Sequence, residues 1–318
     1  MGTTLLRIFG VLLMLTALAL PLMRAPDRAV STLVQRWAPP PSDFLDLQGQ
    51  LVHYRDEGPR SDSTPIVLIH GTGASLHTWE GWARALRGQR RVISFDLPAF
   101  GLTGPFTGAY AGQPYRGDNY ARFVLDLLDT LKVQRFVVGG NSLGGEVAWH
   151  VAAMAPQRVD KLVLVDAAGY AVEPLSVPVA WRIAQVPGLN RLGEHLLPRP
   201  LVVASVREVY GDPARVTEAL VDRYFDLSLR EGNRRALVDR LQQMRPGADA
   251  ARIATLKLPT LILWGGRDRL IPLAAAERFK ADIAGSQLIT FESLGHVPQE
   301  EDPQQTVKPV KTFLGLAQ

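Results

Sequence analysis

Short apolar runs recur along the chain and end at glycine, aspartate or proline. An alternating apolar and polar stretch from Asp43 to Gly58 has the period of a β-hairpin. After it come continuous apolar runs, a pattern typical of strands that are buried on both faces. These runs are PIVLIHG (65–71), RRVISFDLP (90–98), RFVVGGNS (135–142), DKLVLVDAA (160–168), LPTLILWGG (258–266) and SQLITFESLGH (286–296).

Helical spacing fills most of the intervals between these runs. The segments with this spacing are 78–87, 119–131, 145–155, 274–281 and 304–316. Strands that alternate with helices predict an α/β fold with a mostly parallel central sheet, helices on both of its faces, and the opening hairpin as an antiparallel edge. In such sheets, ligands bind beyond the carboxyl ends of the strands.

One interval is much longer than the others. About ninety residues separate the sixth and seventh strands, far more than a strand–helix unit needs. Most of them have helical spacing punctuated by proline. We therefore expect a helical cap over residues 170–256, inserted after the sixth strand into a core made of residues 43–169 and 257–318. A cap at this place would shape a pocket and exclude water from it.

The beginning of the chain has a different character. Leu5 to Met23 is apolar apart from Arg7, Thr16 and two helix-breaking interruptions. We interpret residues 1–42 as an uncleaved membrane anchor that ends in a stiff proline-rich linker at 36–43, with an export signal peptide as the alternative. Arginines on both sides of the apolar segment leave its orientation open. We favour the periplasmic or extracellular side for the rest of the chain.

Composition removes several classes of function. The 318 residues are 47% hydrophobic and carry a net charge of only +4, with scattered basic residues, so we expect no nucleic-acid partner. The lack of cysteine excludes thiolate catalysis, disulfides and cysteine metal sites. No metal-ligand cluster, phosphate-binding loop or dinucleotide fingerprint follows a predicted strand, so we expect no metal and no cofactor.

Four glycines surround one serine in VVGGNSLGGE (137–146). Gly140, Ser142 and Gly144 form a Gly-x-Ser-x-Gly motif between a predicted strand and a predicted helix, the context in which this motif marks an exposed nucleophile. The glycines indicate a backbone that turns too sharply, or packs too closely, for ordinary side chains. The pattern therefore predicts that Ser142 is presented for reaction.

A serine hydroxyl needs a base that takes its proton and a carboxylate that orients the base. His296 follows the last predicted strand and Asp268 follows the preceding one, so both project from the same edge as Ser142. The order serine, aspartate, histidine is the one expected for this architecture. Asp166, after the sixth strand, is the alternative acid, although we favour a loop-capping role for it.

The loop HGTGAS (70–75) follows the third strand and can supply an oxyanion hole. We expect the backbone amide of Thr72, together with that of Leu143, to stabilise a developing oxyanion, with Gly73 as the alternative to Thr72. His70 is expected to anchor this loop by hydrogen bonds. Structural or surface roles are expected for the remaining histidines, which are His53, His77, His150 and His195.

From Asp43 to its final helix, the chain resembles the alpha/beta hydrolase superfamily. The resemblance rests on HGTG, DLPAFG, GGNSLGG, WGGRD and GHVPQEEDP, in that order and spacing. It points to a serine esterase or lipase-like member with a helical cap. The resemblance assigns the nucleophile to Ser142, the base to His296, the acid to Asp268, and the oxyanion hole to Thr72 and Leu143. Ala99, in DLPAFG, departs from the glycine that is more usual there.

The choice of serine as the nucleophile limits the reactions that the protein is expected to catalyse. Related dehalogenases and epoxide hydrolases have aspartate where Ser142 stands, whereas an acyl-serine is readily opened by water. We therefore expect a carboxylic ester hydrolase that acts on a small, apolar ester. Its oligomeric state is left open.

Two alternatives remain. HGTGASLHTW is similar to carbon–carbon bond hydrolases of aromatic ring-fission products. Those enzymes resemble one another in a proline–glycine pair where Ala74 and Ser75 stand, and in an aromatic residue where Val297 stands. The second alternative is a non-catalytic, membrane-tethered binding module on a hydrolase scaffold.

Overall fold

An eight-stranded sheet runs through the computed structural model, which describes residues 24–186, 188 and 193–317, and also residues 4, 6, 7, 9, 10 and 14. The strands are β1 (Ser42–Leu47), β2 (Gln50–Glu57), β3 (Ile66–Ile69), β4 (Val92–Phe95), β5 (Phe136–Asn141), β6 (Val159–Val165), β7 (Thr260–Gly265) and β8 (Gln287–Phe291). Their order is β1-β2-β4-β3-β5-β6-β7-β8. Only the β1–β2 and β2–β4 pairs are antiparallel, so the predicted mostly parallel sheet with an antiparallel edge is confirmed.

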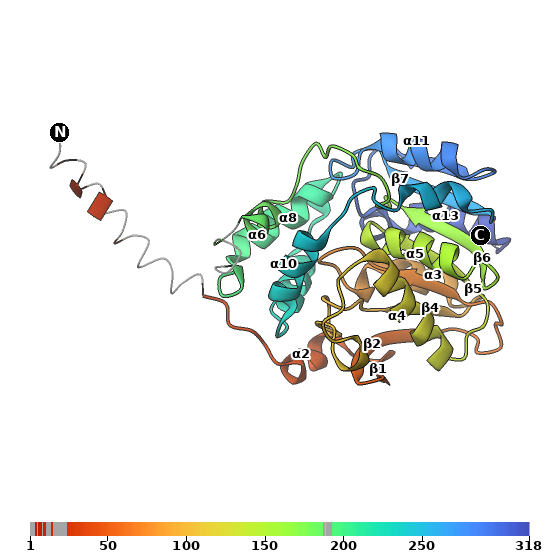
Figure 1. Ribbon diagram of the computed structural model, residues 1–318, viewed down its shortest axis with the longest axis horizontal. Coiled ribbons are helices and arrows are strands. Elements are labelled where there is room, and N and C mark those ends of the chain that lie inside the picture. The colour runs from red at the N-terminus through yellow and green to blue at the C-terminus, as the bar shows by residue number, and fades with distance from the viewer. Residues whose placement is uncertain are drawn as a thin grey trace.

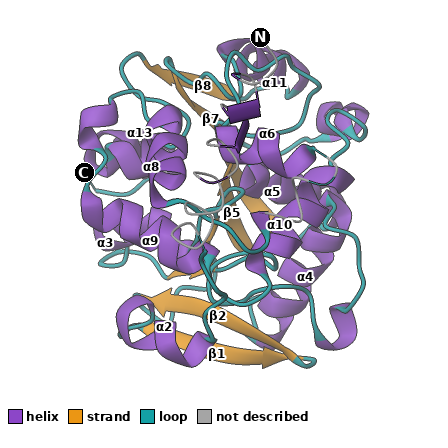
Figure 2. Cartoon of the chain, turned by 90° about the vertical axis from the view of Figure 1, so that its left-hand side faces the viewer, coloured by secondary structure: helices purple, strands orange, loops and turns teal. Residues whose placement is uncertain are grey.

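Helices cover both faces of the sheet, as predicted (Figure 2). One face packs against α4 (Gly117–Thr130), α5 (Leu143–Met154) and α11 (Leu273–Asp282), and the other against α3 (Glu80–Leu86) and α13 (Pro303–Leu314). Alternate strand residues serve the two cores: in β3, Val67 and Ile69 face the first and Ile66 and Leu68 the second. Because both of its faces are buried, such a strand appears in the sequence as an unbroken apolar run.

The chain between β6 and β7 forms α6 (Val179–Gln185), α8 (Arg199–Val209), α9 (Glu218–Ser228) and α10 (Asn233–Gln243). Figure 1 shows α6, α8 and α10 gathered at one end of the sheet. The end of α8 and the turn after it are fastened to the loop after β8, because Val209 O accepts the amide of His296 at 2.8 Å and the Glu301 carboxylate accepts the amides of Gly211 and Gly295. The cap role and the boundaries at 170 and 256 stay predictions.

The segment just before β1 differs from the predicted linker. Arg36 and Trp37 end a helix, α2 (Val30–Trp37), and their side chains bond to Asp226 of α9 at 3.1 and 3.0 Å. Arg28 bonds to the same carboxylate at 2.7 Å. The prediction of a stiff spacer over 36–43 is therefore wrong for its first two residues, which bonds to the distant Asp226 hold against the helical segment, and for its last two, which begin β1.

The predicted anchor, Leu5 to Met23, lies mostly outside the described residues. Within the part of the chain that the structure describes, no helix combines the length and the apolar character needed to cross a bilayer.

Candidate active site

Ser142 stands at the sharp turn between β5 and α5. Its backbone has φ +56° and ψ −119°, in the region that L residues rarely adopt and that costs on the order of 1–3 kcal/mol. Three backbone hydrogen bonds hold this conformation: the Ser142 amide donates to Val165 O, and the Ser142 carbonyl accepts from the amides of Glu146 and Ala168. The strained residue is therefore fixed by the end of β6, the loop after it and the first turn of α5.

The surrounding glycines are required by close backbone packing. A Cβ atom at Gly140 would overlap the carbonyl oxygen of Gly144, and one at Gly144 would overlap that of Ile69. A Cβ atom at Gly145 would meet the side chain of Ala167. The turn that presents Ser142 thus leaves no room for larger residues at these three positions.

Asp268 and His296 are brought together at the ends of β7 and β8. Asp268 Oδ2 lies 2.7 Å from His296 Nδ1, and both side chains are buried. The other carboxylate oxygen of Asp268 accepts the amides of Leu270 and Ile271 at 2.8 and 3.0 Å. Because the carboxylate holds Nδ1 as a donor, Nε2 of the imidazole is left as the basic nitrogen, the form that a general base needs.

Asn141 links this pair to the turn that carries Ser142, a contact that sequence reasoning missed. Its side-chain amide donates to His296 O at 2.9 Å and to Val165 O at 3.2 Å. Asn141 occupies the variable position before the serine, so the motif itself gave no signal for it. The contact fastens the backbone of His296 to the residue that precedes Ser142.

Thr72 and Leu143, the predicted oxyanion-hole residues, border the same cavity as Ser142. Leu143 is the first residue of α5, where backbone amides have no intrahelical partner and the helix dipole favours negative charge. Gly73, the alternative to Thr72, lines a neighbouring cavity instead.

His70 anchors the loop that carries Thr72, as expected. The Leu97 amide donates to His70 Nε2 at 2.9 Å, so Nδ1 carries the proton and donates to Gly71 O at 2.8 Å. Complete burial lowers the pKa of His70, which keeps the ring neutral. A neutral ring with both nitrogens engaged is a structural element and not a base.

Residues 66–308 match the alpha/beta hydrolase family. The chain belongs to this family. An uncharacterized protein of Mycobacterium tuberculosis is 32% identical over 297 residues, which cover 87% of this chain and 82% of that protein.

Two relatives of the hydrolase carry names that bear on its chemistry. The 2-hydroxy-6-oxononadienedioate/2-hydroxy-6-oxononatrienedioate hydrolase of Escherichia coli is 29% identical over 279 residues, covering 84% of this chain and 91% of that one. The crystal structure of a membrane phospholipase A, described as a bacterial virulence factor, is 25% identical with a TM-score of 0.71, and the match covers 99% of this chain and 96% of that one.

Two adjoining cavities lie near Ser142. The first, here called the serine pocket, has a volume of about 340 Å³ and includes Ser142, Leu143 and Thr72. Its charged lining residues are Glu146, Arg182, Arg240, Arg245 and Asp249. Arg240 is paired with Glu146 at 3.3 Å. Charged groups of both signs therefore line the cavity that includes Ser142.

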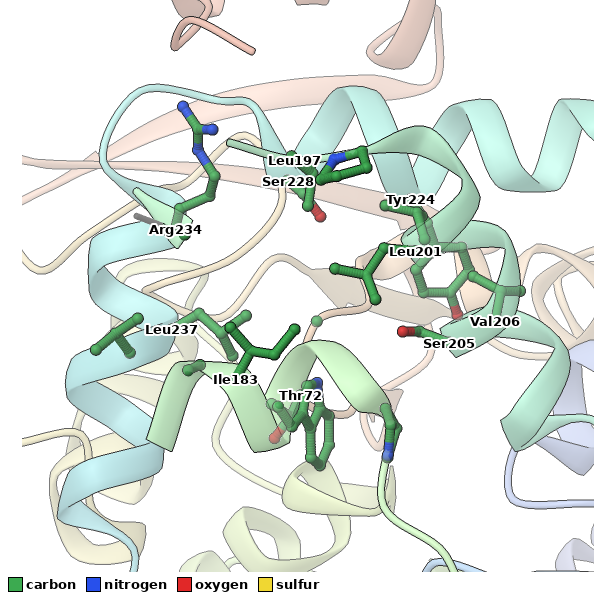
Figure 3. A pocket seen from close by; sticks show the side chains of 18 of the residues that line it. Thr72, Ile183, Leu197, Leu201, Ser205, Val206, Tyr224, Ser228, Arg234 and Leu237 are labelled. Carbon is green, nitrogen blue, oxygen red and sulfur yellow. The ribbon is translucent and has the colours of Figure 1, made fainter. Parts of the chain in front are cut away.

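The second cavity, here called the apolar chamber, lies among α6, α8, α9 and α10 (Figure 3). Its volume is about 320 Å³, and Ile183, Leu201 and Leu237 point toward one another across it. Thr72 and Trp181 border both cavities. The apolar chamber therefore adjoins the serine pocket at Thr72 and Trp181.

Proposed function

We propose that this hydrolase cleaves carboxylic esters that carry an apolar chain, through an acyl-enzyme formed on Ser142. The observation that carries the proposal is the apolar chamber, which shares the oxyanion residue Thr72 with the cavity of the nucleophile. An ester bond placed at Ser142 thus has an aliphatic site within reach for one of its arms. A phospholipase A, the class named for the related crystal structure, also acts on carboxylic esters.

The proposed reaction has two steps, the acylation of Ser142 by the ester and the hydrolysis of the acyl-serine by water. His296 Nε2 takes the proton of the Ser142 hydroxyl as the oxygen attacks the ester carbonyl, and Asp268 stabilises the imidazolium. The amides of Thr72 and Leu143 stabilise the oxyanion of the tetrahedral intermediate. The imidazolium then protonates the leaving alcohol, and a water activated by His296 opens the acyl-serine.

Chain length is expected to control the rate until the apolar chamber is full. Each buried methylene stabilises the bound ester by about 0.8 kcal/mol, which corresponds to roughly a fourfold rise in kcat/KM per carbon. The measurement is a chain-length series of p-nitrophenyl esters. Leu201→Trp, which fills the chamber, should lower kcat/KM for the long esters about tenfold or more and spare the short ones.

Leu51→Trp is the matched control, because Leu51 lies on β2 and is 48% exposed. It should leave the chain-length profile as in the wild type. A Leu201→Trp profile that coincides with the wild type would contradict the assignment of the chamber to the substrate.

A carbon–carbon bond hydrolase is the second candidate. The Escherichia coli relative is named for a dienedioate substrate, a compound with two carboxylates, and the serine pocket of this chain includes Arg182, Arg240 and Arg245. A ring-fission dienoate therefore belongs in the same assay. Its cleavage, with every ester left intact, would replace the ester proposal by this one.

Attachment to a membrane is also part of the proposal. It is supported by the apolar sequence from Leu5 to Met23 and by the match of 99% of the chain to a membrane phospholipase A. The full-length protein is expected to stay in the membrane pellet after an alkaline carbonate wash, with the hydrolase portion on the periplasmic or extracellular side and open to added protease. Full recovery in the supernatant would contradict the anchor.

A further inference from the structure

Two carboxyl groups lie side by side beneath the imidazole of His296. Asp166 follows β6 and Asp268 follows β7, and these strands are parallel neighbours. Asp166 is fully buried and Asp268 is 5% exposed. One oxygen of each carboxyl and one ring nitrogen of His296 lie within 4.8 Å of one another. Asp166 is therefore part of the surroundings of the triad, although His296 is bonded to Asp268.

The two carboxyls have unequal hydrogen-bond partners. Both oxygens of Asp268 accept hydrogen bonds, one from His296 and the other from two backbone amides. Asp166 Oδ1 accepts one bond, from the Gly265 amide at 2.9 Å, while its Oδ2 has no donor within the described chain. The hydrogen bonds to Asp268 thus stabilise a negative charge on its carboxylate. Asp166 Oδ2 accepts no hydrogen bond from any described residue, so the neutral, protonated form of Asp166 is favoured.

Two adjacent buried carboxyls do not both ionise, since like charges repel strongly in a low-dielectric interior. Burial raises the pKa of Asp166 well above its ordinary value, and the neighbouring Asp268 carboxylate raises it further. Glu301 is the next ionisable group that acts on Asp166, and its negative charge works in the same direction. The shared proton therefore resides on Asp166.

The backbone of Asp166 is held in a position that an L residue seldom takes. Its φ is +44°, and its amide donates to Leu263 O of β7 at 3.0 Å. Such a conformation costs on the order of 1–3 kcal/mol and persists only where the surroundings fix it. The fold thus keeps this carboxyl between the ends of β6 and β7.

We propose that Asp166 is a positioning residue: a neutral carboxylic acid whose Oδ2–H donates to the Asp268 carboxylate and fixes it under His296. A donor without charge orients the acid of the triad and adds no second negative charge beside the imidazole. The inference rests on the proposed function only in taking Ser142, Asp268 and His296 as the triad.

Two substitutions at Asp166 distinguish the effect of its hydrogen-bond donor from the effect of a negative charge at this position. Asp166→Asn keeps both bonds, since the amide oxygen can accept from Gly265 and the amide nitrogen can donate to Asp268, and it is neutral at every pH. Asp166→Leu has a similar size and no donor. The readout is the rate of Ser142 labelling by a fluorophosphonate across pH 5 to 10, beside ester kcat/KM, with circular dichroism as the check on folding.

We expect Asp166→Asn to retain labelling within about tenfold of wild type, and Asp166→Leu to fall about 10- to 100-fold below Asp166→Asn, because a hydrogen bond to a charged group is lost. The acid limb of the labelling profile should coincide in wild type and Asp166→Asn. If Asp166 were ionised, its removal would shift that limb about one unit or more to lower pH.

Such a shift, or equal losses in the asparagine and leucine variants, would overturn the proposal. If the leucine variant does not fold, the position of the acid limb in Asp166→Asn still decides. Labelling reports on the triad whatever the natural substrate is. Normal labelling without ester turnover would therefore count against the ester proposal alone, and wild-type protein that resists labelling would count against the triad.

Discussion

Ser142→Ala is expected to give a folded protein whose ester turnover is lower by about 10⁶-fold in kcat, the scale seen when the nucleophile of a serine hydrolase is removed. Alanine accepts the positive φ at this position with much the same strain as serine, so the melting temperature should stay within about 3 °C of wild type. Steady-state kinetics, a thermal melt and fluorophosphonate labelling together measure the change.

Ser63→Ala provides the control, because Ser63 is an exposed loop residue that lines neither cavity. It should behave as wild type in all three measurements. Residual turnover of Ser142→Ala within about 100-fold of wild type would mean that the nucleophile lies elsewhere. A folded wild-type protein that shows neither ester turnover nor labelling would favour the non-catalytic binding module over the enzyme.

Asp268→Asn should lower kcat by about 10⁴-fold, because an asparagine amide beside His296 Nδ1 favours the wrong tautomer of the ring. The geometry of the loop should survive, since the remaining side-chain oxygen can still accept the amides of Leu270 and Ile271. The measurement is kcat at the pH optimum, with the thermal melt as the check on folding.

Asp166→Asn is the comparison for this variant, since it makes the same chemical change at the adjacent carboxyl. It should lose at least 100-fold less activity than Asp268→Asn, a gap of about 2.7 kcal/mol. The reverse order, with Asp268→Asn active and Asp166→Asn inactive, would make Asp166 the acid of the triad.

The sheet was predictable because its strands are buried on both faces and so appear as unbroken apolar runs. The sharp turn at Ser142 was predictable for a related reason: close backbone packing at Gly140 and Gly144 admits only glycine, and glycine is visible in the sequence. Where a local steric or burial requirement dictates the residue type, the local structure can be predicted from the sequence.

Contacts between distant segments of the chain could not be predicted in this way, because no local pattern in the sequence indicates them. Asp226 is separated from its partners Arg28, Arg36 and Trp37 by 189 to 198 positions, and an ion pair places no requirement on spacing along the chain. Asn141 is a similar case, since an amide that bonds to a carbonyl oxygen looks like any polar residue. The apolar chamber was foreseen only as apolar helices, because its volume depends on how they pack.

The bonds of Asp226 set a limit on how the protein can be shortened. Removal of the apolar beginning up to β1 would also take away Arg28, Arg36 and Trp37, whose side chains donate hydrogen bonds to Asp226. Because the side chains of Arg28 and Arg36 are 42% and 54% exposed, each lost ion pair costs about 0.2–1 kcal/mol. The penalty would fall on α9, which supplies Tyr224 and Ser228 to the wall of the apolar chamber, so a shortened enzyme that begins at Ser42 would misreport chain-length preference even when it remains soluble.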